Sequence, residues 1–510
     1  MFKKIVAAFA ALALSISLSS CTALDGTTNG PQPTADSAVA AEFTEYYTQT
    51  VSWRSCGEAQ TFCASIEVPV NWSEPAGEKL KLAVAYRKAD IAEPLGSIIF
   101  NPGGPGSSGV DWITDSISQL GTEDLRSNFN LVGFDPRGVG QSEPKIKCLD
   151  SKGTDYFLYG DSGLALGSKE DIFETRQRVK KFTEACLENT GENLGFVDTV
   201  STAKDLDVIR AVFGDAQINY LGFSYGTLIG STYAELFTER VGRMVLDGAI
   251  NPLVSDAEQS VLQLKGFDQA LKNYLTDCLS SSDCPFSGTV VDAEIRITKL
   301  LRQLELNQLP TDSGRELTIW GAVTGLIMPL YSKSWWPALS QAFTEALQGD
   351  GTTFLEMADA YNERKQDGSY ATNLMEANVS VSCLDSRQPS DDASMALQNK
   401  RVLAASPTLG RYWQFGALAC EQWPFAVVKS PESYRASGSK PIVVIGTTGD
   451  PATPYSQAVQ LANDVLENAT LITYRGEGHT IYGQDNQCVN NAVDAYFIEN
   501  IVPSEELICR

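Results

Sequence analysis

Short apolar runs alternate with amphipathic segments along most of the chain, and this alternation predicts its secondary structure. Residues 63–70 and 79–86 form candidate strands, the second with regular alternation of apolar and polar side chains, and a turn at 71–77 joins them. An amphipathic segment predicts a helix at 201–213, and the segment after the strand at 218–221 predicts a helix at 225–237. The other predicted strands are 96–100, 130–134, 218–221, 243–246, 441–446 and 469–474.

Most of these strands are apolar on both faces, which is typical of a parallel sheet covered by helices on both sides. We therefore predict an α/β fold with a mostly parallel central sheet. The pattern changes at residues 254–412, where most segments are helical or loop-like. We expect a mainly helical cap there, inserted between two parts of the core, residues 46–253 and 413–510. Caps on such folds shape the substrate pocket.

The first residues predict export. Two lysines precede an apolar run at 5–18, which is too short to span a bilayer but suits the core of a signal peptide. Small residues then lead to Cys21, which resembles a bacterial lipobox; the alternative is a plain secretory signal with an incidental cysteine. We expect a signal peptide at 1–20 and a lipidated Cys21 on a flexible tether, residues 21–45. The protein is then a cell-envelope lipoprotein, held at the cell membrane and partly secreted.

Composition restricts the partners and cofactors. The formal net charge of −24 repels nucleic acid, and no Lys/Arg cluster opposes it, so we exclude a nucleic-acid partner. Apart from Cys21 the chain has ten cysteines, an even number that indicates five disulfides in an exported protein. A single histidine and the lack of a C-x-x-C pair argue against a metal site, so we expect no metal and no cofactor. Proximity along the chain suggests the pairs Cys56–Cys63, Cys148–Cys186, Cys278–Cys284, Cys383–Cys420 and Cys488–Cys509.

A G-x-S-x-G motif at residues 222–226 lies between a predicted strand and a predicted helix. In that context the sharp turn lifts the hydroxyl of Ser224 clear of the sheet. The next backbone N–H, that of Tyr225, lies at the positive end of the helix and can stabilise an oxyanion. The alternative is an ordinary Gly/Ser turn, since the motif arises readily by chance in a chain with 41 glycines.

A second glycine-rich segment, NPGGPGSSG at residues 101–109, follows the strand at 96–100. Such a segment can turn its backbone N–H groups inward and form an anion-binding nest. The alternative is a flexible loop, but two prolines stiffen the segment. We expect it to form the second half of an oxyanion hole.

Two later strands lead into loops that carry Asp450 and His479, so both side chains emerge at the same sheet edge as Ser224. Ser, Asp, His is the order of a catalytic triad on an α/β-hydrolase sheet. An imidazole can take the serine proton at neutral pH, and a carboxylate fixes its tautomer and stabilises the cation that forms. A structural role is the alternative for His479.

Other carboxylates compete with Asp450 as the acid of the triad. Asp247 also follows a strand, but Asp450 is favoured because its strand directly precedes the histidine strand. Asp135 is a weaker candidate. We expect Asp135 and Arg137 to form a structural turn with an internal ion pair.

Six segments together resemble the actinobacterial α/β-hydrolases related to tripeptidyl aminopeptidases and to the lipoprotein carboxylesterase A, within the serine peptidase clan of proline iminopeptidases. The resemblance implies Ser224, Asp450 and His479 as the triad, and Gly104 and Tyr225 as oxyanion donors. It also implies an exported enzyme that removes short peptides from free N-termini or cleaves esters and amides. The segments are NPGGPGSSG, VGFDPRGVGQSEP, NYLGFSYGT, RMVLDGAINP, IGTTGDPATP and GEGHT.

The chain also departs from the proline iminopeptidases. Pro102 stands where they have the histidine of H-G-G-P-G, and their amine-binding glutamates have no aligned equivalent here. An exopeptidase needs a carboxylate that holds the substrate ammonium group. Asp385, two residues after Cys383, is the candidate; the alternative is a solvated cap residue.

Three functions fit these residues to different degrees. The first is a serine peptidase that acts on peptide N-termini, and the second is a carboxylesterase or lipase-like enzyme with the same triad. The third, a binding lipoprotein with a decayed triad, is disfavoured because all three triad positions are intact. We expect a peptide or ester substrate, contact with the membrane only through the lipid anchor, and a monomer.

Overall fold

The computed structural model describes residues 30–34, 38–504 and 507–510 of the chain. The predicted signal peptide, Cys21 and most of the predicted tether lie outside these residues. Among the described helices, none is both long and apolar enough to cross a membrane.

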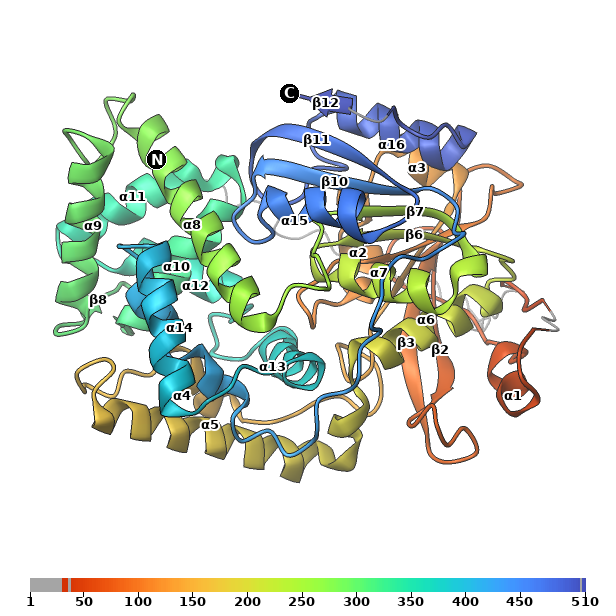
Figure 1. The fold of residues 1–510 in the computed structure, drawn as a ribbon, viewed down its shortest axis with the longest axis horizontal. Coiled ribbons are helices and arrows are strands. Elements are labelled where there is room, and N and C mark those ends of the chain that lie inside the picture. Colours follow the sequence, from red (N-terminus) through yellow and green to blue (C-terminus); the bar gives the residue numbers. More distant parts are fainter. Residues whose placement is uncertain (1–29, 35–37, 505–506) are drawn as a thin grey trace, which may run out of the picture.

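A ten-stranded sheet formed by the described residues crosses the molecule in the order β1-β2-β3-β5-β4-β6-β7-β10-β11-β12 (Figure 1). Neighbouring strands from β5 to β12 in this order are parallel, whereas β1, β2 and β3 add antiparallel strands at one edge. The predicted fold class is confirmed. The strands are β1 (Arg54–Ser55), β2 (Thr61–Pro69), β3 (Lys79–Arg87), β4 (Ser97–Asn101), β5 (Asn130–Phe134), β6 (Ile218–Phe223), β7 (Val241–Asp247), β10 (Ile442–Gly449), β11 (Ala469–Glu477) and β12 (Leu507–Cys509).

Helices cover both faces of the sheet because successive strand residues point to opposite sides and are apolar on both. In β10, Ile442 and Val444 pack into the core shared with α6 and α7, whereas Val443 and Ile445 pack into the core shared with α2 and α16. The helices around the sheet are α1 (Thr44–Tyr47), α2 (Gly109–Asp115), α3 (Glu123–Asn128), α6 (Thr199–Val212), α7 (Tyr225–Leu236), α15 (Tyr455–Gln460) and α16 (Gln487–Glu499).

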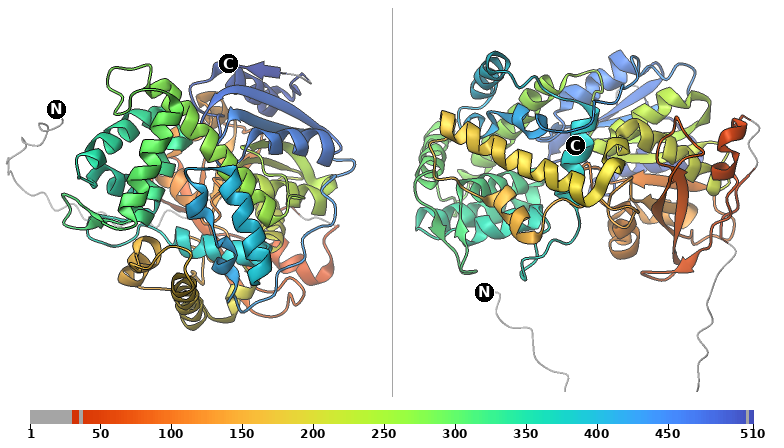
Figure 2. Two further views of the ribbon diagram at one scale, coloured as in Figure 1. Left: turned by 60° about the vertical axis from the view of Figure 1, so that its left-hand side comes forward. Right: turned by 90° about the horizontal axis from the view of Figure 1, so that it is seen from below.

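A second helical layer, which we call the cap, lies on the left in Figure 1 and has a hydrophobic core of its own. Helix α4, which precedes Ser224 in the chain, joins this layer, since Tyr159 belongs to its core, whereas Phe182 and Cys186 of α5 pack into the core at the sheet. In Figure 2, seen from below, α5 runs along the outside of the molecule from the cap toward the sheet. The helices are α4 (Ser151–Tyr159), α5 (Lys169–Thr190), α8 (Asp256–Cys278), α9 (Val290–Leu304), α10 (Ile319–Ile327), α11 (Trp336–Leu347), α12 (Thr352–Tyr361), α13 (Leu374–Asp385) and α14 (Asp392–Ala405), with a small hairpin of β8 (Leu309–Pro310) and β9 (Glu316–Leu317).

The structure contains all five disulfides that proximity along the chain suggested. They close loops of 6 to 38 residues, so each one joins neighbouring parts of the fold. The bond between Cys383 and Cys420 fixes the C-terminal end of α13 to the segment that follows the cap.

The expected ion pair between Asp135 and Arg137 is wrong. The buried guanidinium of Arg137 donates to both oxygens of Asp205 on α6, at 2.5 and 2.7 Å, and to three backbone carbonyls. Asp135 instead accepts hydrogen bonds from the Ser108 hydroxyl and from two backbone N–H groups. Each buried group needs several partners, and a single neighbour two residues away does not satisfy it.

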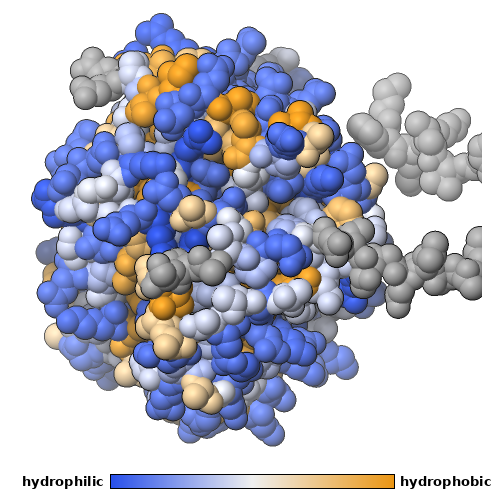
Figure 3. Space-filling model, turned by 90° about the vertical axis from the view of Figure 1, so that its right-hand side faces the viewer, coloured by the Kyte–Doolittle hydropathy of each residue, from blue (hydrophilic) through white to orange (hydrophobic). Residues whose placement is uncertain are grey.

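The molecular face on the right of Figure 1 is mostly hydrophilic. Figure 3 shows its hydrophobic side chains in small groups that hydrophilic residues separate. Small separated groups of this kind are ordinary for the surface of a soluble domain.

We expect Asp205→Ala to lower the free energy of unfolding by about 3–5 kcal/mol, because it leaves the buried Arg137 guanidinium without its counter-charge. Urea unfolding of the purified protein measures this loss. Lys429→Ala is the matched control, since the Lys429–Glu432 pair is exposed and should contribute less than about 1 kcal/mol. Equal losses in the two variants would show that the Arg137–Asp205 pair does not anchor the fold.

Candidate active site

The predicted nucleophile lies at the junction of β6 and α7. Ser224 has φ 54° and ψ −123°, a strained conformation for a residue other than glycine. Its N–H donates to the carbonyl of Asp247 at 2.9 Å, and its own carbonyl accepts from the N–H of Thr227 at 2.8 Å. These bonds hold the turn between the two adjacent strands and the helix, so the half-buried Ser224 lines two neighbouring cavities.

Asp450 follows β10 and His479 follows β11, and the structure brings their side chains into contact. The Nδ1 atom of His479 lies 2.9 Å from each carboxylate oxygen of Asp450. Asp450 also accepts the backbone N–H groups of Ala452 and Thr453, both at 2.9 Å, which orient the carboxylate. The opposite ring atom, Nε2, is buried and has no hydrogen-bond partner among the described residues. It is therefore available to a nucleophile or a substrate in the cavity that His479 and Ser224 line together.

The cap helps to hold this histidine in place. The backbone N–H of His479 donates to the carbonyl of Tyr331 at 2.8 Å, and the two rings make an edge-to-face contact at 5.5 Å. Burial lowers the pKa of His479, but the charge and hydrogen bond of Asp450, helped by the charge of Asp247, outweigh burial and raise it above 6.5. The site thus favours the imidazolium that a general base forms.

The competing acid, Asp247, has a different position. Its Oδ2 atom accepts the backbone N–H groups of Ile481 and Tyr482, both at 2.8 Å, and burial raises its pKa to about 6. No hydrogen bond joins it to the imidazole among the described residues. Asp247 therefore shapes the loop that carries His479, while Asp450 is the carboxylate that contacts the ring.

The glycine-rich loop passes between the nucleophile turn and helix α13. At Gly103 (φ +100°) a Cβ would lie 2.7 Å from the carbonyl oxygen of Phe223, and at Gly106 (φ +103°) 2.7 Å from that of Leu374. Both positions therefore require glycine. Gly104, between them, lines both cavities with Ser224.

The two backbone donors suggested for an oxyanion lie in this region. Neither the N–H of Gly104 nor that of Tyr225 has a hydrogen-bond acceptor within the described part of the chain. The N–H of Tyr225 begins helix α7, where the helix dipole favours negative charge. Two free N–H groups beside a serine hydroxyl suit the charge that develops on a substrate carbonyl.

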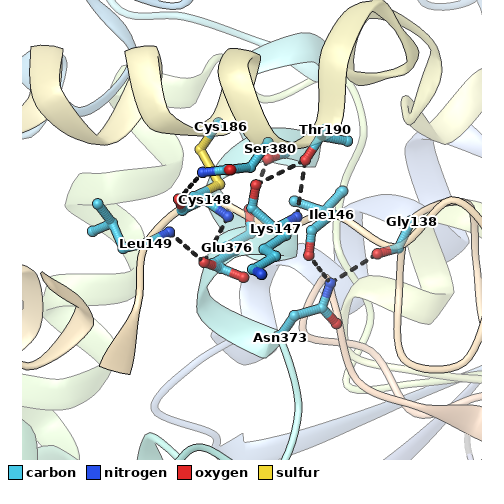
Figure 4. The surroundings of a disulfide bond; sticks show 11 residues. Gly138, Ile146, Lys147, Cys148, Leu149, Cys186, Thr190, Asn373, Glu376 and Ser380 are labelled. Atoms are coloured by element: carbon cyan, nitrogen blue, oxygen red, sulfur yellow. Dashed lines mark hydrogen bonds between the residues drawn. A yellow bond between two sulfur atoms is a disulfide. The ribbon is translucent and has the colours of Figure 1, made fainter. Parts of the chain in front are cut away.

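Helix α13 is fixed to the core beside a disulfide, as Figure 4 shows. The side-chain amide of Asn373 donates to the carbonyls of Gly138 and Ile146, both at 2.8 Å. The carboxylate of Glu376 accepts the N–H groups of Cys148 and Leu149, both at 2.9 Å. These bonds set the position of the helix whose side chains line the site.

The first cavity, of about 440 Å³, is acidic. Asp385 lies in its wall and accepts the N–H and the hydroxyl of Thr199, at 2.9 and 2.5 Å. Burial raises the pKa of Asp385 to about 7, and the Thr199 hydroxyl in turn contacts the hydroxyl of Tyr225 at 2.5 Å. A second carboxylate, Asp256, lines the same cavity, and none of the lining residues is Lys, Arg or His. Asp385 thus faces the site and is not a solvated cap residue.

The second cavity, of about 480 Å³, is mostly apolar. Sequence reasoning identified Gly104, Ser224 and His479 in this lining, but it missed the apolar residues of the cap and also Asp256, because these carry no motif. One signal was available, since Asn378, Ser382 and Asp385 recur at helical spacing and line the first cavity together. The side chains that make the second cavity apolar are Pro102, Leu158, Tyr331, Tyr361, Leu374, Met375 and Val379.

Comparison with known proteins agrees with this geometry. Residues 96–485 match the family model described as the alpha/beta hydrolase fold. The chain belongs to the alpha/beta hydrolase family. In this family the nucleophile lies on the turn between a strand and a helix, and the acid and the histidine follow later in the chain.

The alpha/beta hydrolases most similar to this chain include three actinobacterial proteins. Serine protease Hip1 of Mycobacterium tuberculosis is 34% identical, with 90% of this chain and 91% of the relative covered. Carboxylesterase B of the same species is 36% identical, with 90% and 89% covered. Tripeptidyl aminopeptidase of Streptomyces lividans is 28% identical, with 90% and 86% covered. The expected family is confirmed, and the protein is a serine hydrolase.

We expect the kcat/KM of this hydrolase for an uncharged ester to fall as the pH falls through a value above 6.5. A general base must be neutral, and the neutral form of His479 prevails only above its raised pKa. Asp450→Asn removes the charge that raises this pKa. The midpoint of the pH profile of the residual activity should therefore lie at a lower pH than in the wild type. Asp464→Asn, an exposed position, is the control. An unchanged profile in Asp450→Asn would contradict the assigned contact.

Proposed function

We propose that this serine hydrolase is an exported peptidase that releases short peptides, tripeptides in particular, from free N-termini. The observation that carries the proposal is the acidic cavity beside Ser224. Among the residues that the structure describes, its lining has two carboxylates and no cationic side chain, so it is suited to receive a positive charge near Ser224.

The proposed reaction is acyl transfer in two steps. The Ser224 hydroxyl attacks the carbonyl carbon while His479 takes its proton and Asp450 stabilises the imidazolium. The N–H groups of Gly104 and Tyr225 bind the oxyanion. The imidazolium then gives the proton to the leaving nitrogen, the C–N bond breaks, and a water molecule hydrolyses the acyl-enzyme by the same path.

Asp385 is the proposed partner of the substrate ammonium group. Each of its oxygens accepts one hydrogen bond from Thr199, which leaves lone pairs toward the cavity. The described residues offer it no salt bridge, and the nearby charge that acts on it is another carboxylate, Asp198. A cationic amine would supply the missing counter-charge and stabilise the ionised form.

The spacing along α13 supports the length of the released peptide. Asn378 lines both cavities with Ser224, and Asp385 lies seven residues further along the helix. At a rise of 1.5 Å per residue this is about 10 Å. Three residues of extended chain also span about 10 Å. This spacing matches the length of the tripeptide that we propose lies between Ser224 and Asp385.

The relatives support both this proposal and one alternative. Two of the similar proteins are named serine protease and tripeptidyl aminopeptidase, which favours peptide substrates. A third is named carboxylesterase, and the second cavity at Ser224 is apolar. The alternative is therefore an ester hydrolase of the cell envelope that uses the same nucleophile.

A paired assay tests the function. We expect free-amine tripeptide anilides to be cleaved and their N-acetylated forms to be cleaved at least about tenfold more slowly, since acetylation removes the charge that Asp385 binds. Asp385→Asn should lose about tenfold or more in kcat/KM on the free-amine substrate and little on an acyl ester. Ser224→Ala should abolish every activity and serves as the blank.

The other outcomes of this assay contradict specific parts of the proposal. Equal rates on free and acetylated peptides would contradict the proposed role of Asp385 and would indicate an endopeptidase. Cleavage of esters alone would indicate the carboxylesterase. Full activity in Ser224→Ala would contradict the assignment of Ser224 as the nucleophile.

The place of action is also proposed. The five disulfides suit an oxidising compartment outside the cytoplasm, and the N-terminal pattern at Cys21 suits a lipid anchor at the cell membrane. We expect the wild-type protein to enter the detergent phase of a Triton X-114 extraction and Cys21→Ser to enter the aqueous phase. Ala40→Ser, in the predicted tether, is the control. Equal partitioning of wild type and Cys21→Ser would contradict the anchor.

A further inference from the structure

The two cavities at the nucleophile meet along one helix. Asn378 of α13 lines both of them, as do Ser224 and Gly104. The N-terminal part of α13 faces the apolar cavity with Leu374, Met375 and Val379, and the C-terminal part faces the acidic cavity with Ser382 and Asp385. The two ends of a substrate therefore meet walls of opposite character.

The position of His479 indicates which of the two cavities receives the leaving group. His479 lines the apolar cavity and does not belong to the lining of the acidic one. Its Nε2 atom takes the proton of Ser224 and passes that proton to the leaving group as the bond to the carbonyl carbon breaks. The leaving group must be within hydrogen-bond reach of Nε2, so it departs on the side of the apolar cavity.

We propose that the apolar cavity is the leaving-group subsite and that it selects an apolar residue, of the size of Leu, Met or Phe, directly after the scissile bond. This inference rests on the proposed function for the placement of the acyl portion over the acidic cavity. Hexyl or benzyl alcohol would occupy the same subsite in an ester.

The residues of this subsite explain the selectivity. Leu158 of α4 and Met375 and Val379 of α13 supply apolar contact, and the titratable side chains in the lining are His479 and two tyrosines. An acidic side chain would lose its hydration there and would meet no Lys or Arg among the described lining residues, which is costly. A volume of about 480 Å³ holds one large side chain and leaves an opening for the rest of the peptide.

The first experiment measures kcat/KM for peptides with one fixed tripeptide followed by Leu, Gly or Asp. We expect kcat/KM for the Leu peptide to exceed that for the Gly and Asp peptides by about tenfold or more. Hydrophobic pockets distinguish side chains by factors of this size. Leu158→Ala and Met375→Ala should each reduce this ratio by about threefold or more. Val254→Ala, in the acidic cavity only, is the matched control and should keep the ratio. Thermal unfolding of each variant identifies any that is misfolded.

The second experiment keeps the test independent of peptidase activity. It compares methyl and benzyl esters of one acyl group in the same four proteins. If peptides are not cleaved but benzyl exceeds methyl by about tenfold and Met375→Ala reduces the ratio, the proposed function fails and the subsite stands. If the wild type shows no preference in either series, or if Val254→Ala alone removes it, the subsite assignment is overturned.

Discussion

Close contact of the glycine-rich loop with two backbones is the constraint on which the site depends. The loop touches the nucleophile turn at Gly103 and the first residue of α13 at Gly106, and at both places a Cβ would meet a carbonyl oxygen at 2.7 Å. One short segment therefore sets the distance between the catalytic core and the cap. A shift of α13 would displace the loop, and with it the N–H of Gly104 near Ser224. The amide of Asn378, which donates to the carbonyl of Pro105 at 3.1 Å, strengthens this contact.

Four carboxylates around the site have distinct tasks because their partners differ. Asp450 meets the imidazole, Asp247 holds the backbone of the histidine loop, and Asp135 holds the start of α2 through Ser108. Among the described residues, Asp385 accepts hydrogen bonds from the backbone and hydroxyl of Thr199 and has no cationic partner, so it can pair with a cation in the cavity. The residue type is the same in each case, and the surrounding donors decide what it does.

Peptidases and esterases share this core, so the nucleophile by itself does not select a substrate. We propose that the cap makes the selection. Helix α13 carries acidic and apolar side chains at its two ends, and Gly104 and Ser224 line both cavities that these ends face. A substrate that is positively charged at one end and apolar beyond the scissile bond matches both walls. This is the reason that the free N-terminus and the residue after the scissile bond are the two features that we propose the enzyme recognises.

The sequence by itself determined the α/β sheet, the positions of Ser224, Asp450 and His479 after their strands, and the five disulfides, because periodicity, strand-end motifs and short loop spacings involve neighbouring residues. It did not determine that Arg137 pairs with Asp205, or that Tyr159 of α4 packs into the core of the cap. Only the tertiary structure decided the walls of the two cavities, which Leu158, Asp256 and α13 line together with Ser224. Contacts of this kind come from the packing of whole helices that are far apart in the chain, and such packing leaves no local period or motif.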